Sequence, residues 1–567
     1  MSMWQVGLAA LAAVVGMVVV GSSAAALNAG DDNEARARRF VAKHEATVKP
    51  LEIEVGRRWW AANISGKDED YRLKQEAETR LELQLADPKT FADLKAIREG
   101  RLDDPLLARQ IQVLYLQYLA RQVDPELLKA MLARSNKIEQ AFNVFRAKVG
   151  AKELTDSDVR RVLRTSTDSL QRKAVWEASK GVGRAVEADL KELVRLRNQA
   201  AKRLGFKDYH VMQLALGEQS QEQVLKLFDE LDALTRKPFL AAKAELDAVL
   251  ARNCGIAAGD LRPWHYHDPF FQESPAVFGA PDEALFAKVD ILKVCREFYG
   301  GIGLPIDDVL ARSDLYEKPG KNPHAFCFDI DRNGDVRVLA NIVPNEQWLS
   351  TMIHELGHAT YSSKNIPASV SYVLRMEAHA LTTEGVAMMF ERFVRNPAWL
   401  AALGVQVPNP EAFRQRAMKI RRNHLLIFSR WCQVMFRFEK ALYADPEGDL
   451  NRTWWDLVEK YQGVRRPEGR DAPDYAAKIH IVVAPAYYHN YMMGELFAAQ
   501  VHHTIARNVL AGVDPATAVY VGNKAVGRYM IERVYAPGRT LDWNRLTKHA
   551  TGEDLSAKAF ARDFSAK

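Results

Sequence analysis

The stretch LSTMIHELGHATY, residues 349–361, combines an apolar periodicity with a cluster of polar side chains. Its apolar residues recur at helical spacing, which predicts an α-helix with one buried face, and Asn345 upstream is expected to cap it. His354 and His358 are four residues apart, so their imidazoles lie one turn apart on the same side of that helix. Glu355 is rotated from His354 by about 100°, the turn of an α-helix per residue.

Two imidazoles in this arrangement can bind one metal ion, while Glu355 can reach a water on the ion without binding the ion itself. H-E-x-x-H on a helix is the arrangement of zinc metalloproteases. The alternative is a surface helix that carries these residues by chance. The segment HAFCFDIDRNGDVRVLANIV, residues 324–343, disfavours the alternative, because Asn333-Gly334 between two apolar runs predicts an antiparallel hairpin directly before the helix. We therefore expect one Zn²⁺ per chain.

A catalytic zinc needs a third protein ligand and one open position. The segment SYVLRMEAHALTTEGVAMMFERF, residues 371–393, is predicted to be the next long helix, with Glu377, Glu384 and Glu391 seven residues apart on one stripe. A solvated acidic face is the ordinary alternative, but apolar residues such as Ala380 share the stripe. We predict Glu384 as the third ligand, with Glu377 as the alternative.

A second unusual stretch, KIHIVVAPAYYHNYMMGEL at residues 478–496, concentrates tyrosine and histidine. Tyr488 and Tyr491 are three residues apart and are expected on one helix face. Tyrosines on apolar helices usually only pack. Beside a zinc site, however, a phenol can donate a hydrogen bond to the oxyanion of a tetrahedral intermediate, and Lys478 can bind a carboxylate.

Composition narrows the class of protein. The 567 residues are 48% hydrophobic, as in a globular fold with a large core, and the net charge is +6 without a long Lys/Arg block. Nucleic-acid binding is therefore not expected. Helical periodicity dominates, which predicts an all-α, mainly helical protein; the clearest windows are 104–149, 155–204, 219–253, 410–446 and 486–511.

The N-terminus differs from the rest, because residues 4–27 carry no charge. We expect a signal peptide or an uncleaved membrane anchor over residues 1–27, and an exported protein, periplasmic or secreted. The cysteines Cys254, Cys295, Cys327 and Cys432 are too few and too scattered for a disulfide scaffold. Free thiols are expected, with a Cys254–Cys295 disulfide as the alternative.

Three segments carry a family resemblance. HELGHATY, HALTTEGVAMMFER and KIHIVVAPAYYHNYMMGELF together resemble the angiotensin-converting-enzyme family of zinc peptidases. HAFCF and YYHNYMMGELF are also similar to thimet oligopeptidases. The resemblance covers most of residues 35–540 and implies a two-lobed helical ellipsoid with a deep central channel and a small antiparallel β element near the zinc. Residues 28–567 would then form one peptidase domain.

The resemblance also implies roles for individual residues. His354, His358 and Glu384 would be zinc ligands, and Glu355 the general base. The remaining positions, by implied role, are His480 and Tyr491 for transition-state contacts, His324 and Ala325 for substrate contacts on the hairpin, and Lys478 with Tyr488, or alternatively Tyr487, for the substrate's C-terminal carboxylate. The arginine that supports chloride activation in mammalian members falls at Asn490, which argues against chloride dependence and leaves chloride only as a possible cofactor.

The implied activity is zinc-dependent hydrolysis of oligopeptides by a zinc-bound water that Glu355 activates, with release of C-terminal dipeptides. An endo-acting oligopeptidase is the close alternative. An inactive exported peptide-binding protein is the alternative from another class. The expected partners are short peptides, the membrane is contacted only through an uncleaved N-terminal anchor, and the protein is expected to be a monomer.

Overall fold

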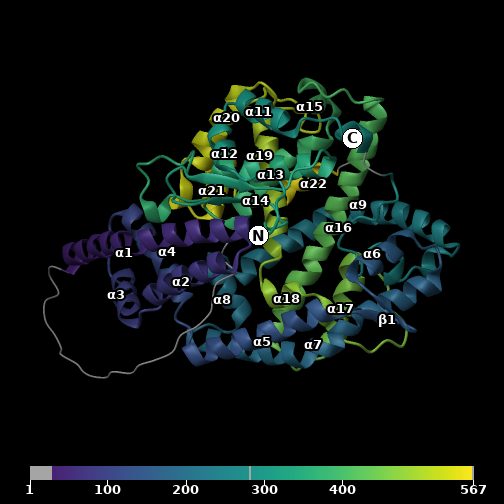
Figure 1. Ribbon diagram of the computed structural model, residues 1–567, viewed down its shortest axis with the longest axis horizontal. Coiled ribbons are helices and arrows are strands. Elements are labelled where there is room, and N and C mark those ends of the chain that lie inside the picture. Colours follow the sequence, from purple (N-terminus) through teal and green to yellow (C-terminus); the bar gives the residue numbers. More distant parts are fainter. Residues whose placement is uncertain (1–28, 280–282, 565–567) are drawn as a thin grey trace.

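The computed structural model describes residues 29–279 and 283–564 of the 567-residue chain. Helices make up most of these residues, and the strands form two small antiparallel hairpins (Figure 1). The predicted mainly helical fold is confirmed. The expected signal peptide or anchor at residues 1–27 lies outside the described residues, and none of the helices in the described part is long and apolar enough to cross a membrane.

The N-terminal helices repeat one starting signal. Asp87, Asp104 and Asp124 each precede a proline, and each accepts a hydrogen bond from a backbone amide in the following turn. Proline at the first helical position sacrifices no hydrogen bond, because that amide has no partner within the helix. The helices of this part are α1 (Ala29–Ser65), α2 (Asp68–Leu85), α3 (Pro88–Glu99), α4 (Pro105–Leu119) and α5 (Pro125–Val144).

The rest of the chain forms the main body. Its first helices are α6 (Asp156–Thr165), α7 (Ser169–Arg203), α8 (Tyr209–Leu216), α9 (Gln221–Cys254), α10 (Glu283–Phe286), α11 (Ile291–Gly301) and α12 (Asp307–Arg312). After the second hairpin follow α13 (Glu346–Tyr361), α14 (Ala380–Glu391), α15 (Pro397–Ala402), α16 (Pro410–Ala444), α17 (Leu450–Leu457), α18 (His480–Val483), α19 (His489–Asn508), α20 (Lys524–Tyr529), α21 (Trp543–Thr551) and α22 (Lys558–Arg562). The five helical windows are confirmed, apart from short breaks and the end of the first.

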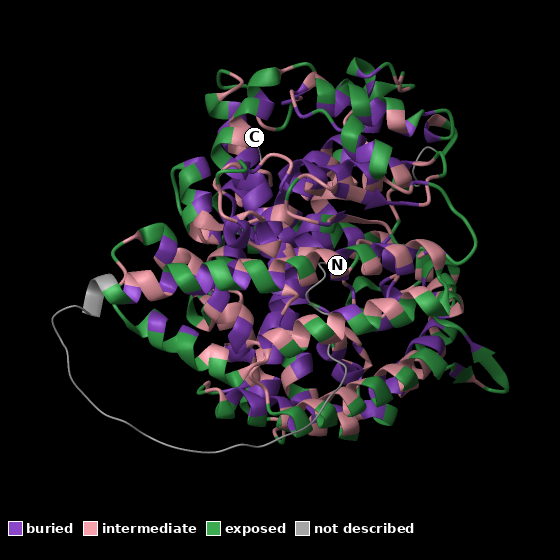
Figure 2. Cartoon of the chain, turned by 60° about the vertical axis from the view of Figure 1, so that its left-hand side comes forward, coloured by how far each residue is buried: buried purple, intermediate pink, exposed green. Residues whose placement is uncertain are grey.

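The main body contains two large hydrophobic cores, and α9 and α16 contribute to both. On α16 the neighbours Trp431 and Cys432 are both fully buried but belong to different cores. Figure 2 shows buried residues concentrated inside the body and exposed residues on the outer helix faces. Residues 425–436 of α16 are nearly all buried, so this part of the helix packs between the two cores as a shared element.

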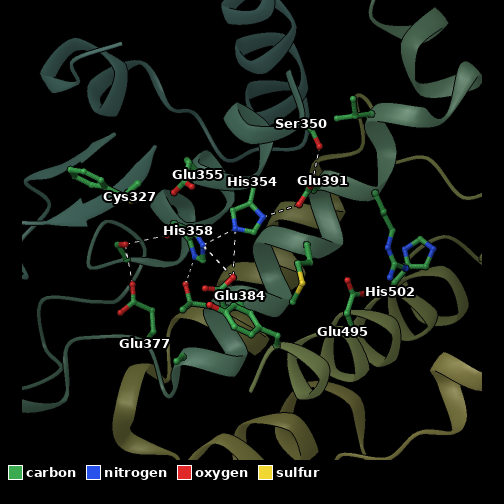
Figure 3. Close-up of a pocket in the computed structure, with 18 of the residues that line it drawn as sticks. Cys327, Ser350, His354, Glu355, His358, Glu377, Glu384, Glu391, Glu495 and His502 are labelled. Carbon is green, nitrogen blue, oxygen red and sulfur yellow. Dashed lines mark hydrogen bonds and ion pairs between the residues drawn. The ribbon is translucent and has the colours of Figure 1, made fainter. Parts of the chain in front are cut away.

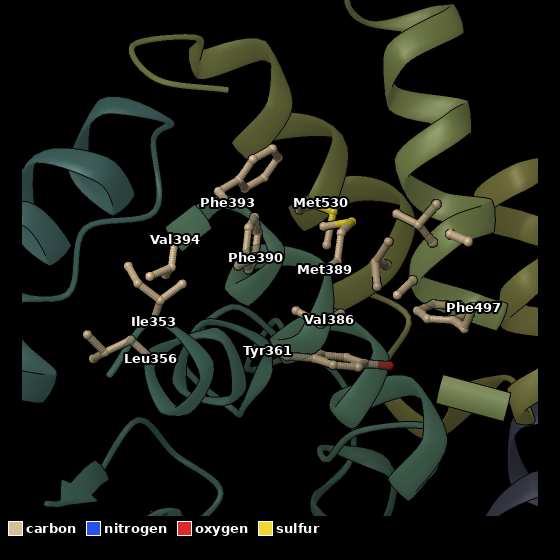
Figure 4. Close-up of a cluster of buried hydrophobic side chains, with 14 of the residues drawn as sticks. Ile353, Leu356, Tyr361, Val386, Met389, Phe390, Phe393, Val394, Phe497 and Met530 are labelled. Carbon is tan, nitrogen blue, oxygen red and sulfur yellow. The ribbon is translucent and has the colours of Figure 1, made fainter. Parts of the chain in front are cut away.

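Helices α13, α14 and α19 pack into one layered core. Figure 4 shows side chains of α14, including Phe390, between Ile353 of α13 and Phe497 of α19. A Cβ atom added at Gly385 of α14 would lie 2.7 Å from the carbonyl oxygen of Gly494 on α19. Glycine at both positions therefore permits a close approach of the two helices, and this approach fixes where their polar side chains lie.

The predicted hairpin before α13 is confirmed. β3 (Phe326–Asp329) pairs antiparallel with β4 (Val336–Leu339), with Phe326 opposite Leu339. The connection is longer than a two-residue turn and uses positive φ at Arg332 and Gly334, 51° and 96°. A second hairpin, β1 (Ala147–Val149) with β2 (Lys152–Leu154), was not predicted, so the end of the helical window 104–149 is wrong.

The prediction of one long helix over residues 371–393 is also wrong. A short 3-10 turn covers Tyr372–Leu374, and α14 begins only at Ala380. His379 caps α14, since its Nδ1 accepts a hydrogen bond from the Leu381 amide at 3.1 Å. The Ala378 amide donates to the Tyr361 hydroxyl at 3.2 Å. These contacts hold the preceding segment in an irregular conformation, and Glu377 therefore lies outside the helix that carries Glu384.

Candidate metal centre

Helices α13 and α14 bring three potential metal ligands together. The Nε2 atoms of His354 and His358 lie 3.1 Å apart. Glu384 Oε2 is 3.6 Å from His354 Nε2 and 3.9 Å from His358 Nε2. Figure 3 shows the three side chains pointing toward one another. Among the described residues, this is the one group of at least three His, Cys, Asp or Glu side chains whose ligand atoms all lie within 4.8 Å of one another.

Hydrogen bonds on the far side of each ring orient the two imidazoles. His354 Nδ1 lies 2.9 Å from Glu391 Oε2, and His358 Nδ1 lies 2.7 Å from Thr383 Oγ1. Because a carboxylate can only accept, the Nδ1–H of His354 donates to Glu391. The Thr383 hydroxyl can accept from a His358 Nδ1–H, and with this tautomer both Nε2 atoms carry lone pairs toward the shared centre. Histidine ligands of metals are usually held like this.

These distances fit a zinc ion. Zn–N bonds of about 2.0–2.1 Å at a tetrahedral angle place two nitrogens roughly 3.3 Å apart. The two Nε2 atoms, at 3.1 Å, are close to this value. Two imidazole lone pairs facing each other at such a distance repel unless a cation lies between them. Two nitrogens and one carboxylate oxygen are also a donor set of catalytic zinc sites, which leave a fourth position open.

The electrostatics of the site favour a bound cation. Burial works to raise the pKa of Glu384, but the two imidazoles outweigh it and hold that pKa at about 2. Burial lowers the pKa of His358 to about 3. Burial also disfavours a charged His354, yet the neighbouring carboxylates of Glu384 and Glu391 raise its pKa well above the ordinary value. The centre therefore has an ionised carboxylate and favours a positive charge, which a metal ion would supply in place of a proton on His354 Nε2.

Glu355 lies beside the centre without being part of it. Burial raises its pKa, against a smaller opposing effect of the backbone at Cys327 in β3. Figure 3 shows Glu355 between Cys327 and His354. A buried carboxylate with a raised pKa is a stronger base than an exposed one, so this position suits proton transfer next to the metal centre.

A cavity of about 1080 Å³ adjoins the three side chains. The predicted residues His354, Glu355, His358, Glu384 and Tyr491 line it. The described residues that line it do not include His324, Ala325, Lys478, His480 or Tyr488. The three predicted metal ligands, Glu355 and Tyr491 thus share one space, whereas His480 and the predicted substrate-contact residues do not line it.

Lys478 and Tyr488 belong to a neighbouring buried cluster. Lys478 Nζ donates to Gln272 Oε1 at 2.5 Å and lies 5.5 Å from the centroid of the Tyr488 ring. Burial lowers the pKa of Lys478 to about 8. The Tyr488 ring is 5.6 Å from that of Tyr491, which does line the cavity. His480 packs against Tyr488 at 5.4 Å, and its buried Nδ1 has no hydrogen-bond partner.

The remaining predicted residues lie near the hairpin or its edge. His324 is exposed and Ala325 half-buried, and both precede the first residue of β3. Glu377 lines the cavity, but its carboxylate accepts a hydrogen bond from the Ser362 hydroxyl at 3.1 Å and is not part of the ligand group. All four cysteines are free thiols.

Sequence reasoning missed the partners that orient the site. It considered Glu391 only as a member of an acidic stripe, and it did not single out Thr383 or Gln272. The spacing of Thr383 and Glu391 around Glu384 on α14 could have indicated the first two, since both flank a proposed ligand. No local pattern marks Gln272, which lies 206 residues from Lys478 in the sequence.

Comparisons with known proteins agree with this geometry. A family model described as angiotensin-converting enzyme, peptidase M2, matches residues 31–239 and 283–566. The angiotensin-converting enzyme-like protein Ace3 of Mus musculus is 23% identical over 584 residues, covering 94% of this chain and 76% of that protein. The angiotensin-converting enzyme of Bos taurus is 22% identical over 566 residues, covering 92% of this chain but only 42% of that protein.

Proposed function

The chain belongs to the angiotensin-converting enzyme family of peptidases, and from this premise we propose that it is a zinc-dependent enzyme that releases dipeptides from the C-termini of oligopeptides. The observation that supports this most strongly is the convergence of His354, His358 and Glu384 on one point at the edge of a large cavity, with Glu355 beside them. Residues 28–567 would act as one two-lobed domain in a monomer.

His354, His358 and Glu384 would hold the zinc. A zinc ion in such a site supplies Lewis acidity, which polarises a substrate carbonyl and lowers the pKa of water to about 7. Glu355 would take a proton from the attacking water and pass it to the leaving amine. Burial raises the pKa of Glu355, which makes its carboxylate a stronger base for this transfer.

Tyr491 and His480 would stabilise the oxyanion. Burial raises the pKa of Tyr491 to about 12, so its phenol keeps the proton that it must donate. Burial lowers the pKa of His480 to about 4, so this imidazole is neutral near pH 7 and one ring nitrogen carries a hydrogen. Loss of one such donor typically costs about 10²–10³ in rate.

The buried Lys478, assisted by Gln272 and Tyr488, would bind the C-terminal carboxylate of the peptide. In the described sheet β3 pairs only with β4, so its other edge can accept an extended peptide beside His324 and Ala325. Chloride is not assigned a role. Export is proposed on the uncharged segment 4–27 alone, which lies outside the described residues.

The substitution Glu355→Gln tests the proposal. We expect the variant to keep one zinc per chain by elemental analysis and to lose at least about 10³-fold in peptide hydrolysis, because the amide cannot accept the proton. His354→Ala should lose the metal itself. Wild-type turnover in Glu355→Gln would refute the assignment. Stoichiometric zinc in the wild-type protein without hydrolysis of any member of a peptide library would instead favour an inactive peptide-binding protein.

One observation favours an endo-acting oligopeptidase as the second candidate, namely that Lys478 is not among the residues lining the cavity. Amidation of a substrate's C-terminus separates the two activities. An enzyme that binds the C-terminal carboxylate should lose most of its kcat/KM when the peptide is amidated. An endopeptidase should cleave both forms at similar rates and at the same internal bonds.

A further inference from the structure

The cavity extends past the metal centre into a region rich in arginine. Arg392, Arg395, Arg414 and Arg421 all line it. Three of these have carboxylate partners, since Arg395 pairs with Glu346, Arg414 with Glu411, and Arg421 with Asp563 at 3.3 Å. Arg392 is the exception. Within residues 29–279 and 283–564, no hydrogen bond or ion pair joins its guanidinium to another group, and its Nε is buried without a partner.

The acidic groups nearest to Arg392 among the described residues form no ion pair with it. Asp563 already pairs with Arg421 and accepts a hydrogen bond from His503 at 2.7 Å. Glu495 also lines the cavity but forms no ion pair with Arg392 or with any other described cation. Figure 3 shows Glu495 beside His502, on the side of Glu384 away from Cys327. A guanidinium held in a partly buried space without a counterion is costly, and it fits a carboxylate in two parallel hydrogen bonds.

The position of Arg392 relates it to the reaction centre. It directly follows Glu391, whose carboxylate accepts the hydrogen bond from His354. Glu495 is one helical turn after Tyr491 on α19, so the two side chains share a face. Arg392 and Glu495 therefore line the same cavity as the metal centre, and a peptide bound across that centre can place one of its side chains beside them.

We propose that Arg392 forms a specificity subsite for an acidic side chain of the peptide substrate. The inference rests on the proposed peptidase function and adds a substrate class to it, peptides with Asp or Glu near the cleaved bond. Glu495 lies in the same branch of the cavity and weakens anion binding there through its own charge. The subsite is separate from the cluster around Lys478, which does not line this space.

The test compares peptides that carry Glu or Gln at each successive position, hydrolysed by the zinc-loaded full-length enzyme. At one position of the peptide, the wild type should show a higher kcat/KM with Glu than with Gln, which gives a Glu/Gln ratio above one. Arg392→Gln should lower this ratio by roughly tenfold or more, the loss expected for a charge-assisted hydrogen bond. Glu495→Gln should raise it. Arg414→Gln is the matched control, since it removes one cavity-lining cation that already has a partner, and it should leave the ratio unchanged.

The outcomes separate the subsite from other roles. If Arg392→Gln and Arg414→Gln lowered the Glu/Gln ratio of kcat/KM equally, the preference would come from net charge. This result would overturn the proposal. If Arg392→Gln lowered kcat/KM equally for the Glu and the Gln peptide, the proposal would also be overturned, because Arg392 would then support only the fold. An unchanged ratio in Arg392→Gln would reject a peptide subsite at this arginine.

A binding measurement keeps the inference testable if the peptidase proposal fails. Calorimetry of the zinc-loaded Glu355→Gln protein with the same peptides should show tighter binding of the acidic member. The double variant Glu355→Gln/Arg392→Gln should lose that preference. Equal affinities of the double and single variants for both peptides would refute the subsite, whatever the hydrolysis experiments show about the enzyme.

Discussion

Glu391 sets the tautomer of a proposed zinc ligand. Its Oε2 accepts from His354 Nδ1 at 2.9 Å, and its Oε1 accepts from the Ser350 hydroxyl at 2.7 Å. The second contact fixes the carboxylate, so that the first can hold the imidazole with Nε2 toward His358. Such partners of metal ligands usually matter almost as much as the ligands, because they fix ring orientation and raise the basicity of the ligand nitrogen.

We predict that Glu391→Gln weakens zinc binding by about 10- to 100-fold, the usual cost of losing such a partner. Competition with a chelator of known affinity measures the zinc Kd directly. Glu377→Gln is the control, because it also removes a cavity-lining carboxylate but one that contacts Ser362. Equal zinc affinity in the wild type and Glu391→Gln would show that Glu391 does not position His354.

For single residues, the sequence predicted side chains of the site whose positions follow from helical spacing. The positions of His354 and His358 follow from a separation of four residues, and Glu384 from a periodic stripe. The partners of Lys478 and Arg392 could not be predicted in the same way. Gln272 meets Lys478 through tertiary packing across 206 residues, and an arginine without a counterion is recognisable only after every nearby carboxylate has been placed.

Among the helices, the contact between α14 and α19 holds the parts of the site together. Glu384 precedes Gly385 on α14, and Tyr491 lies one turn before Glu495 and close to Gly494 on α19. A Cβ at Gly385 would meet the Gly494 carbonyl oxygen and the Phe497 ring, each at 2.7 Å. Backbone atoms cannot move aside as a flexible side chain can, so any larger residue must separate the helices.

Gly385→Ala is accordingly expected to destabilise the protein by about 1–3 kcal/mol, as overpacking of a core does. It should also weaken zinc binding by displacing Glu384. Denaturant unfolding and chelator competition measure the two effects. Gly300→Ala in α11 is the matched control, because an added Cβ there has no atom within 4 Å. It should be neutral or stabilise by up to about 1 kcal/mol. Equal stability of the two variants would contradict the proposed close contact.

The sequence predicted helix boundaries correctly where a local signal sets them. It failed where a tertiary contact sets them. The Asp-Pro pairs before α3, α4 and α5 are local, because each aspartate caps its own helix. The segment 371–379 has helical periodicity, but the Tyr361 hydroxyl takes the Ala378 amide out of any helical ladder. That contact depends on α13 already being in place, which periodicity within the segment cannot reveal.

In the molecule as a whole, the N-terminal helices form part of the wall of the cavity beside the metal centre. Glu52 of α1, Glu82 of α2 and Gln117 of α4 line it. Glu52 links these helices to the main body, since it accepts from the Tyr372 hydroxyl at 2.8 Å and pairs with Arg332 of the hairpin turn at 3.2 Å. The metal centre therefore faces a cavity that is partly walled by the N-terminal helices.

This partial wall predicts selection by size, because a flexible chain can enter such a cavity and a folded domain cannot. A good substrate peptide fused to the C-terminus of a stable folded protein should resist cleavage when the linker has about two residues. A linker of about 15 flexible residues, which spans up to about 50 Å when extended, should restore cleavage toward that of the free peptide. Mass spectrometry of the products over a series of linker lengths gives the threshold. Cleavage at equal rates with the shortest and longest linkers would mean that the N-terminal helices open far enough to admit a folded domain, and the cavity wall would then not determine which substrates are accepted.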